Sequence, residues 1–183
     1  MREGLERAYG ELVSASGDDP GRDGLRIPPE RAAEAFAFLT SGYRFDAAAE
    51  LADAVFPSES EEMVAVKDIE LYSLCEHHLL PFFGHAHVAY VPDATIVGFS
   101  KIARIVDSFA HRLQVQERLT AQIAGTLMET LNARGVGVVV EARHLCVAMR
   151  GVRKQNPVMR TSRMLGTFRT DSATRAEFLD LIR

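Results

Sequence analysis

The sequence predicts an α+β fold in which a helical first third precedes a region of alternating strands and helices. Apolar residues recur at helical spacing in the first third, and from Met63 the pattern changes to the period of a strand. The rest reads as strand, strand, helix, helix, strand, strand. We therefore expect residues 1–57 to form an N-terminal helical region and residues 58–183 to form the main region of one globular unit.

The helical first third follows from two apolar patterns. Leu5, Ala8 and Leu12 form one stripe, and two prolines at 28 and 29 open a second helical run through residue 43. The Gly- and Asp-rich segment 17–24 is expected to be the loop between them.

The main region is predicted element by element from residue 63 onward. A strand leads to Cys75, and a second strand after it forms an antiparallel hairpin. Ser100 stands where an N-cap would precede the next helix, and a second helix ends near a glycine. The expected bounds after Cys75 are 82–91 for the strand, 100–113 and 116–133 for the helices, and 136–150 and 157–169 for the last two strands.

The composition of the chain limits the kinds of partner that it is expected to bind. The net charge is -4, and 47% of residues are hydrophobic, which suits one packed core and argues against general nucleic-acid binding. The N-terminus lacks the uncharged apolar core of a signal peptide, and no stretch reads as a membrane span. We expect a cytoplasmic protein that binds neither nucleic acid nor membranes.

The two cysteines, Cys75 and Cys146, each lie beside histidine and suggest a zinc site. Cys75 and His78 are close enough for one loop to present both, and Cys146 would complete the site from a distant element. Three protein ligands leave a fourth position for water, as in catalytic zinc sites. The alternative is that both cysteines are small buried apolar residues.

Two further histidines adjoin the ligands. His77 precedes His78, and strand alternation predicts that His144 and Cys146 point to one face. Both histidines are candidate acid and base groups, although they could serve only to orient ligands. His85 and His87 share a strand face and could form another metal pair, but we interpret them as ordinary strand histidines.

A basic cluster suggests an anion site. Ser100, Lys101 and Arg104 lie at a predicted helix start, and Arg150 ends the predicted strand that carries Cys146. The alternative is a solvated surface. Glu117 begins the next helix, where its carboxylate could cap the helix or accept the two adjacent N–H donors of guanine.

Several stretches together resemble the zinc-dependent GTP cyclohydrolase I family. They include SLCEHHLLPFFGHAHVAYVP, VGFSKIARIVDSFAHRLQVQERLTAQIA, VEARHLCVAMRGVRK and TSRMLGTFR, and the likeness covers most of the chain. Phe99 and His111 are modest departures from that pattern. The resemblance implies zinc held by Cys75, His78 and Cys146, with His77 and His144 as acid-base groups. It further implies triphosphate binding by Ser100, Lys101, Arg104 and Arg150, and guanine recognition by Gln116 and Glu117.

The resemblance also implies the tunnelling fold for the catalytic region 58–183: an antiparallel four-stranded sheet with two helices on one face. Family members are decamers of two stacked pentamers with active sites at subunit junctions. The implied reaction converts GTP and water to 7,8-dihydroneopterin triphosphate and formate, with His144 protonating N7 and His77 assisting the later rearrangement. Two alternatives remain: an enzyme that stops at a ring-opened formamide or accepts another purine nucleotide, and a non-enzymatic zinc-stabilised assembly module.

Overall fold

A computed structural model describes residues 2–52 and 54–183, and the chain divides into two compact units, Met1–Ser41 and Gly42–Arg183. The functional division after residue 57 stays a prediction. Within the described residues, no helix is both long enough and apolar enough to cross a membrane.

The first unit is a helical hairpin, and its two helices and the loop between them were predicted. Arg2 joins its two long helices by donating hydrogen bonds to Glu30 at 2.7 Å and Glu34 at 2.8 Å. The rings of Tyr9 and Phe36 also meet edge to face at 6.4 Å. The elements are α1 (Arg2–Ala15), η1 (Asp23–Leu25) and α2 (Pro28–Leu39).

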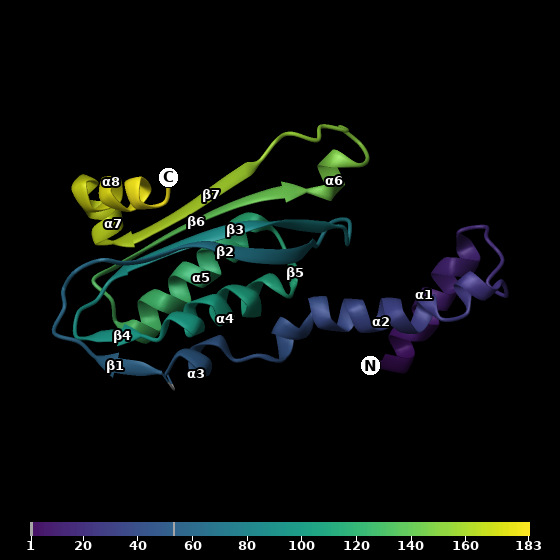
Figure 1. Cartoon of the computed structure of the whole chain (residues 1–183), viewed down its shortest axis with the longest axis horizontal. Helices are drawn as coiled ribbons and strands as arrows, with labels where there is room; N and C mark the ends of the chain where they lie inside the picture. The colour runs from purple at the N-terminus through teal and green to yellow at the C-terminus, as the bar shows by residue number, and fades with distance from the viewer. Residues whose placement is uncertain (1, 53) are drawn as a thin grey trace. The chain divides into compact units, whose positions relative to one another are not determined.

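The second unit holds the sheet and its covering helices (Figure 1). The elements are η2 (Ser41–Arg44), α3 (Ala47–Ala52), β1 (Val55–Pro57), β2 (Val64–Cys75), β3 (Pro81–Val91), β4 (Thr95–Val97), α4 (Phe99–Ala110), β5 (Leu113–Gln114), α5 (Gln116–Leu131), β6 (Gly135–His144), α6 (Leu145–Ala148), β7 (Met159–Gly166), α7 (Thr167–Thr170) and α8 (Ser172–Leu181).

The sheet has the strand order β5-β2-β3-β6-β7. Its four long strands are antiparallel neighbours, which confirms the expected four-stranded arrangement. The two-residue strand β5 adds a parallel pairing at the edge, with Cys75 opposite Gln114, and β1 pairs with β4 in a separate ribbon. Such short strands show no readable periodicity, and the sequence analysis did not predict them.

The sheet is covered on both faces. Val138 and Val140 are fully buried in the large core that includes the apolar sides of α4 and α5. Val139 points the other way and packs in a smaller cluster with Phe168 of α7 and Phe178 of α8. Figure 1 shows α4 and α5 on one side of the strands and α7 and α8 on the other. The predicted helix pair on one face is confirmed, and a second, smaller layer lies opposite.

Candidate active site

Three candidate ligands converge at one end of the sheet. The ligand atoms of Cys75, His78 and Cys146 all lie within 4.8 Å of one another, with Cys75 Sγ 3.7 Å from His78 Nδ1. Cys75 ends β2, and the following turn is closed because Leu79 donates its N–H to the Cys75 carbonyl at 2.8 Å. Leu79 has a φ of 54°, so this tight turn holds a leucine in the left-handed region.

Cys146 reaches the cluster by a different route from the one predicted. The strand β6 ends at His144, and Cys146 lies in the short helix α6, so the expectation that His144 and Cys146 share a strand face is wrong. Met149 donates its N–H to the Leu145 carbonyl at 3.0 Å, which closes a helical turn around Cys146. The apolar sequence Leu145-Cys146-Val147-Ala148 contains no glycine or proline to mark this change.

The donor set suits a zinc ion. Burial, followed by the adjacent Cys75 thiol, raises the pKa of the Cys146 thiol. A divalent cation bound by cysteine instead favours the thiolate form. Two sulfurs and one imidazole are ligands that zinc prefers, and three of them leave one coordination position open.

The loop residues between the ligands are held by a contact that sequence analysis missed. Arg118 of α5 donates to both carboxylate oxygens of Glu76, at 2.6 and 3.0 Å, and lowers the pKa of Glu76. Glu76 lies directly after Cys75, so the pair fastens the metal loop to α5. The sequence did contain a signal for this ion pair. An acidic residue, Glu76, lies inside the Cys-Glu-His-His motif, and a basic residue, Arg118, lies inside Gln-Glu-Arg-Leu.

His77 lies beside the ligand group on its exposed side. Its Nδ1 is 3.9 Å from Cys75 Sγ, and its Nε2 is 3.8 Å from Glu76 Oε1. The side chain is 64% exposed, so it can exchange protons with bound substrate or with water.

His144 is fixed by stacking and by one hydrogen bond. Its ring stacks on Phe82 with centroids 4.6 Å apart and planes 7° from parallel. Its Nε2 lies 2.8 Å from Gln116 Oε1. Burial lowers the pKa of His144, and the charge of Glu117 opposes this in part.

Gln116 determines which nitrogen of His144 carries hydrogen. Its amide nitrogen donates to the carbonyls of Val140 and Met159, both at 3.0 Å, so its Oε1 must face His144 as an acceptor. Nε2 of His144 is then the protonated nitrogen of the neutral ring, and Nδ1 is the one left to exchange a proton. Gln116 is only 1% exposed, and this bonding was not foreseen from the sequence.

Glu117 and Arg150 lie near this end as well. Glu117 is exposed in the first turn of α5, and its charge acts on His144. Arg150 is exposed just beyond α6, and its charge partly opposes the rise in the pKa of Cys146. The structure therefore gathers the predicted ligands, both histidines, Gln116, Glu117 and Arg150 at one end of the sheet.

The remaining predicted residues lie elsewhere. Ser100, Lys101 and Arg104 belong to the start of α4, where Gly98 is the N-cap, so Ser100 is inside the helix and does not cap it. Lys101 and Arg104 both donate to Oε1 of Glu50, each at 2.7 Å.

Strand β3 separates the two groups of residues. Its first residue, Pro81, follows the metal loop, and its last, Val91, leads through β4 to the start of α4. Eleven residues of strand span about 35 Å. Figure 1 likewise shows α6 at one end of the sheet and β4 at the other. One chain therefore does not bring Lys101 and Arg104 to its own metal cluster.

Comparisons with known proteins identify the family of the chain. The model of the family described as GTP cyclohydrolase I matches residues 5–183. A protein named GTP cyclohydrolase 1 from Methylococcus capsulatus is 59% identical over 182 residues, covering 100% of this chain and 98% of that protein. Another of the same name from Leptospira biflexa is 57% identical and covers 98% of each chain.

A solved structure, the apo form of the archaeosine synthase QueF-Like, covers 59% of this chain and 97% of its own. Its TM-score is 0.48 at 18% identity. Because the family model matches nearly the whole chain and the relatives match it over nearly their full length, the chain belongs to the GTP cyclohydrolase I family.

Proposed function

We propose that this protein converts GTP and water to 7,8-dihydroneopterin triphosphate and formate. The observation that carries the proposal is the convergence of Cys75, His78 and Cys146, with His144 held beside them. The names of the full-length relatives support the same activity.

Cys75, His78 and Cys146 are the residues that would hold zinc. When bound in such an open site, zinc supplies Lewis-acid activation of water for attack on C8 of the purine. The bidentate pair between Glu76 and Arg118 keeps the loop that bears two of the ligands against α5.

His144 acts as the acid at the imidazole ring of the substrate. Because Nε2 keeps its hydrogen for Gln116, His144 must first take up a proton on Nδ1. The resulting imidazolium delivers that Nδ1 proton to N7 and returns to the neutral ring with hydrogen on Nε2. Stacking on Phe82 limits rotation of the ring, so the donor nitrogen stays in place through ring opening. His77 is exposed beside Cys75 and serves the proton transfers of the later rearrangement.

Guanine recognition is assigned to the start of α5. The Glu117 carboxylate accepts hydrogen bonds from N1–H and the exocyclic amine, the two adjacent donors of guanine. The side chain of Gln116 is engaged with His144, so the part of Gln116 offered to guanine is its backbone N–H, which at the first helical position has no intrahelical acceptor.

Triphosphate binding requires a second copy of the chain. Arg150 lies near the metal cluster, whereas Ser100, Lys101 and Arg104 lie at the far end of β3, a strand longer than an extended nucleoside triphosphate. A neighbouring chain would bring its own α4 start to this metal cluster. We infer a homo-oligomer with active sites between subunits, in the form of a decamer of two pentamers.

Mixed oligomers test the shared site directly. Cys75→Ala lacks a metal ligand, and the double variant Lys101→Met/Arg104→Met lacks the cations, so each alone should release little formate. Co-assembled at equal amounts, they should regain activity at about a quarter of the sites, where both intact halves meet. Failure of the mixture to exceed the separate variants, despite verified co-assembly, would exclude a site built from two copies.

The reaction itself is tested by the products. Zinc-loaded protein incubated with GTP should yield formate together with a pterin that fluoresces after oxidation and dephosphorylation. Cys75→Ala should lose both bound zinc and formate release, and His85→Ala on β3 is the matched control outside the ligand set. Formamide without pterin would indicate a truncated reaction, and no turnover by zinc-loaded protein would refute the assignment.

A further inference from the structure

The two cations at the start of α4 share one carboxylate oxygen. Lys101 Nζ and Arg104 Nη1 each lie 2.7 Å from Oε1 of Glu50. The side chains of Glu50 and Lys101 are only 21% and 18% exposed. Lys101 first, and then Arg104, lower the pKa of Glu50, which keeps this carboxylate ionised at neutral pH.

Glu50 is presented by a firmly placed helix. Its neighbour Leu51 is fully buried, and Asp46 accepts the N–H groups of Ala48 and Ala49, both at 3.1 Å, at the start of α3. These contacts hold the backbone of α3 in place, so the Glu50 side chain reaches the two cations from a fixed position.

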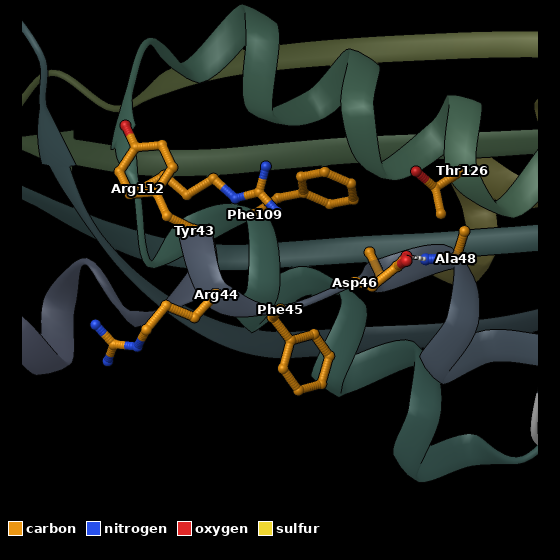
Figure 2. A pocket seen from close by; sticks show the side chains of 9 residues that line it. Tyr43, Arg44, Phe45, Asp46, Ala48, Phe109, Arg112 and Thr126 are labelled. Carbon is orange, nitrogen blue, oxygen red and sulfur yellow. Dashed lines mark hydrogen bonds between the residues drawn. The ribbon is translucent and has the colours of Figure 1, made fainter.

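The segment before α3 is anchored as well. Figure 2 shows Arg112 between the rings of Tyr43 and Phe109, beside a hollow of about 510 Å³ that also includes Asp46. The Arg112 guanidinium carbon lies 4.7 Å from the Phe109 ring centroid and 5.8 Å from that of Tyr43.

We propose that Glu50 is a built-in competitor for the phosphate-binding cations, and that an incoming phosphate must displace its carboxylate from Lys101 and Arg104. A carboxylate oxygen with two short cationic donors has the same bonding as a phosphate oxygen. This inference rests on the proposed assignment of Lys101 and Arg104 to the triphosphate.

Displacement of Glu50 costs the same two ion pairs whichever anion binds, so only a ligand with enough further contacts binds appreciably. A triphosphate has further oxygens for Ser100 and for Arg150 of another copy, and these contacts offset the lost ion pairs. Inorganic phosphate has one phosphorus centre and cannot make them all. Glu50 therefore keeps its ion pairs with Lys101 and Arg104 in the presence of phosphate, and GTP displaces its carboxylate.

Glu50→Gln tests the competition, because it keeps the size of the side chain and removes its charge. We expect zinc-loaded Glu50→Gln oligomer to bind inorganic triphosphate roughly tenfold more tightly by calorimetry, since hydrogen bonds to a charged group are the ones released. The Ki of inorganic phosphate against GTP turnover should fall by a similar factor, and the KM for GTP should fall with it. If this variant fails to assemble, Glu50→Asp should show a smaller change in the same direction.

Glu61→Gln is the matched control for net charge. Glu61 also pairs with an arginine, Arg134 at 2.9 Å, but on the connection before β2. Its removal should leave triphosphate binding and the phosphate Ki within about twofold, as expected for an exposed pair. Unchanged or weaker triphosphate binding by Glu50→Gln would overturn the proposal, because a residue that merely positions Lys101 and Arg104 cannot strengthen binding when it is lost.

The double variant Lys101→Met/Arg104→Met tests the assignment of the cations to the triphosphate separately from the competition by Glu50. If this double variant binds inorganic triphosphate as well as the unaltered protein, the assignment of the cations in the proposed function fails, and the role of Glu50 fails with it. If the double variant binds weakly but Glu50→Gln brings no gain, the cation assignment stands and only the competition is refuted.

Discussion

Arg118 donates hydrogen bonds to both carboxylate oxygens of Glu76, which lies between the candidate metal ligand Cys75 and the histidine pair. The ion pair spans from the metal loop to the first turns of α5, the helix that also bears Gln116 and Glu117. The loop that bears the candidate metal ligands and the helix that bears the proposed guanine contacts are thereby held in one fixed relation.

Arg118→Met should weaken zinc binding while leaving the fold intact. The loop would lose its tie to α5, and loss of such supporting contacts typically reduces metal affinity by about 10- to 100-fold. Competition with a chromogenic chelator measures the affinity. Arg134→Met, which breaks the pairs with Glu61 and Asp93, is the control and should retain normal zinc affinity. Equal zinc affinity in both variants would mean that the loop holds its shape without Arg118.

Gln116→Leu should lower kcat by about ten- to hundredfold with zinc still bound, because His144 would lose the partner that fixes its protonated nitrogen. Stability should fall by about 2 kcal/mol as well, since the carbonyls of Val140 and Met159 lose a donor. Formate release and urea unfolding measure the two effects.

Thr161→Val distinguishes the loss of the bond to His144 from a general loss of packing around Gln116. It removes one hydroxyl bonded to Gln116, at 3.2 Å, without touching His144. It should cost some stability and leave kcat nearly unchanged. A kcat loss as large as that of Gln116→Leu would show that packing, and not the bond to His144, is the cause.

Glu117→Gln should raise the KM for GTP by about tenfold or more, because a neutral amide cannot accept two hydrogen bonds from guanine on one charged group. Zinc content should not change. Glu129→Gln, an exposed residue on the same helix, is the control. An unaltered KM for Glu117→Gln would remove Glu117 from guanine recognition.

His87 should make the free energy of unfolding depend on pH. Burial lowers its pKa from the ordinary 6.5, partly opposed by Asp68, and its Nδ1 accepts the Asp68 N–H at 3.2 Å. The unfolded chain therefore binds a proton at higher pH than the folded chain does. The contribution of His87 is complete above about pH 6.5 and is lost as the pH falls.

His87→Gln should flatten the fall in unfolding free energy between about pH 7 and pH 5. Urea titrations at several pH values measure this slope. His85→Gln, at the exposed histidine of the same strand, is the comparison. An identical slope in His87→Gln and the unaltered protein would assign the pH dependence to other groups.

The parts of the fold that sequence predicted have long, regular patterns. The alternation before Cys75 and the helical spacing after Gln116 placed β2 and α5 within a few residues of their observed bounds. The cluster of candidate ligands was also predictable from the sequence. Cysteine and histidine are the residue types that bind zinc, and Cys75, His78 and Cys146 do come together in one group.

The parts that escaped prediction depend on tertiary contacts. The helix α6 is a single turn without a start signal, and β5 exists because Gln114 pairs with Cys75 from a distant strand. The role of Gln116 is decided by which acceptors surround its amide, and no spacing in the sequence shows them. The helix α8 did have a signal, since Asp171 caps it by accepting the N–H groups of Ala173 and Thr174.

The wide separation of Cys75 and Cys146 along the chain gives zinc a second consequence. A metal held by both would act as a removable cross-link between the β2–β3 turn and the end of β6, closing a long loop that the unfolded chain cannot close at low cost. Metal affinity and folding stability then become one linked quantity. Zinc depletion should release this end of the sheet first, while the core beneath α4 and α5 holds the rest together.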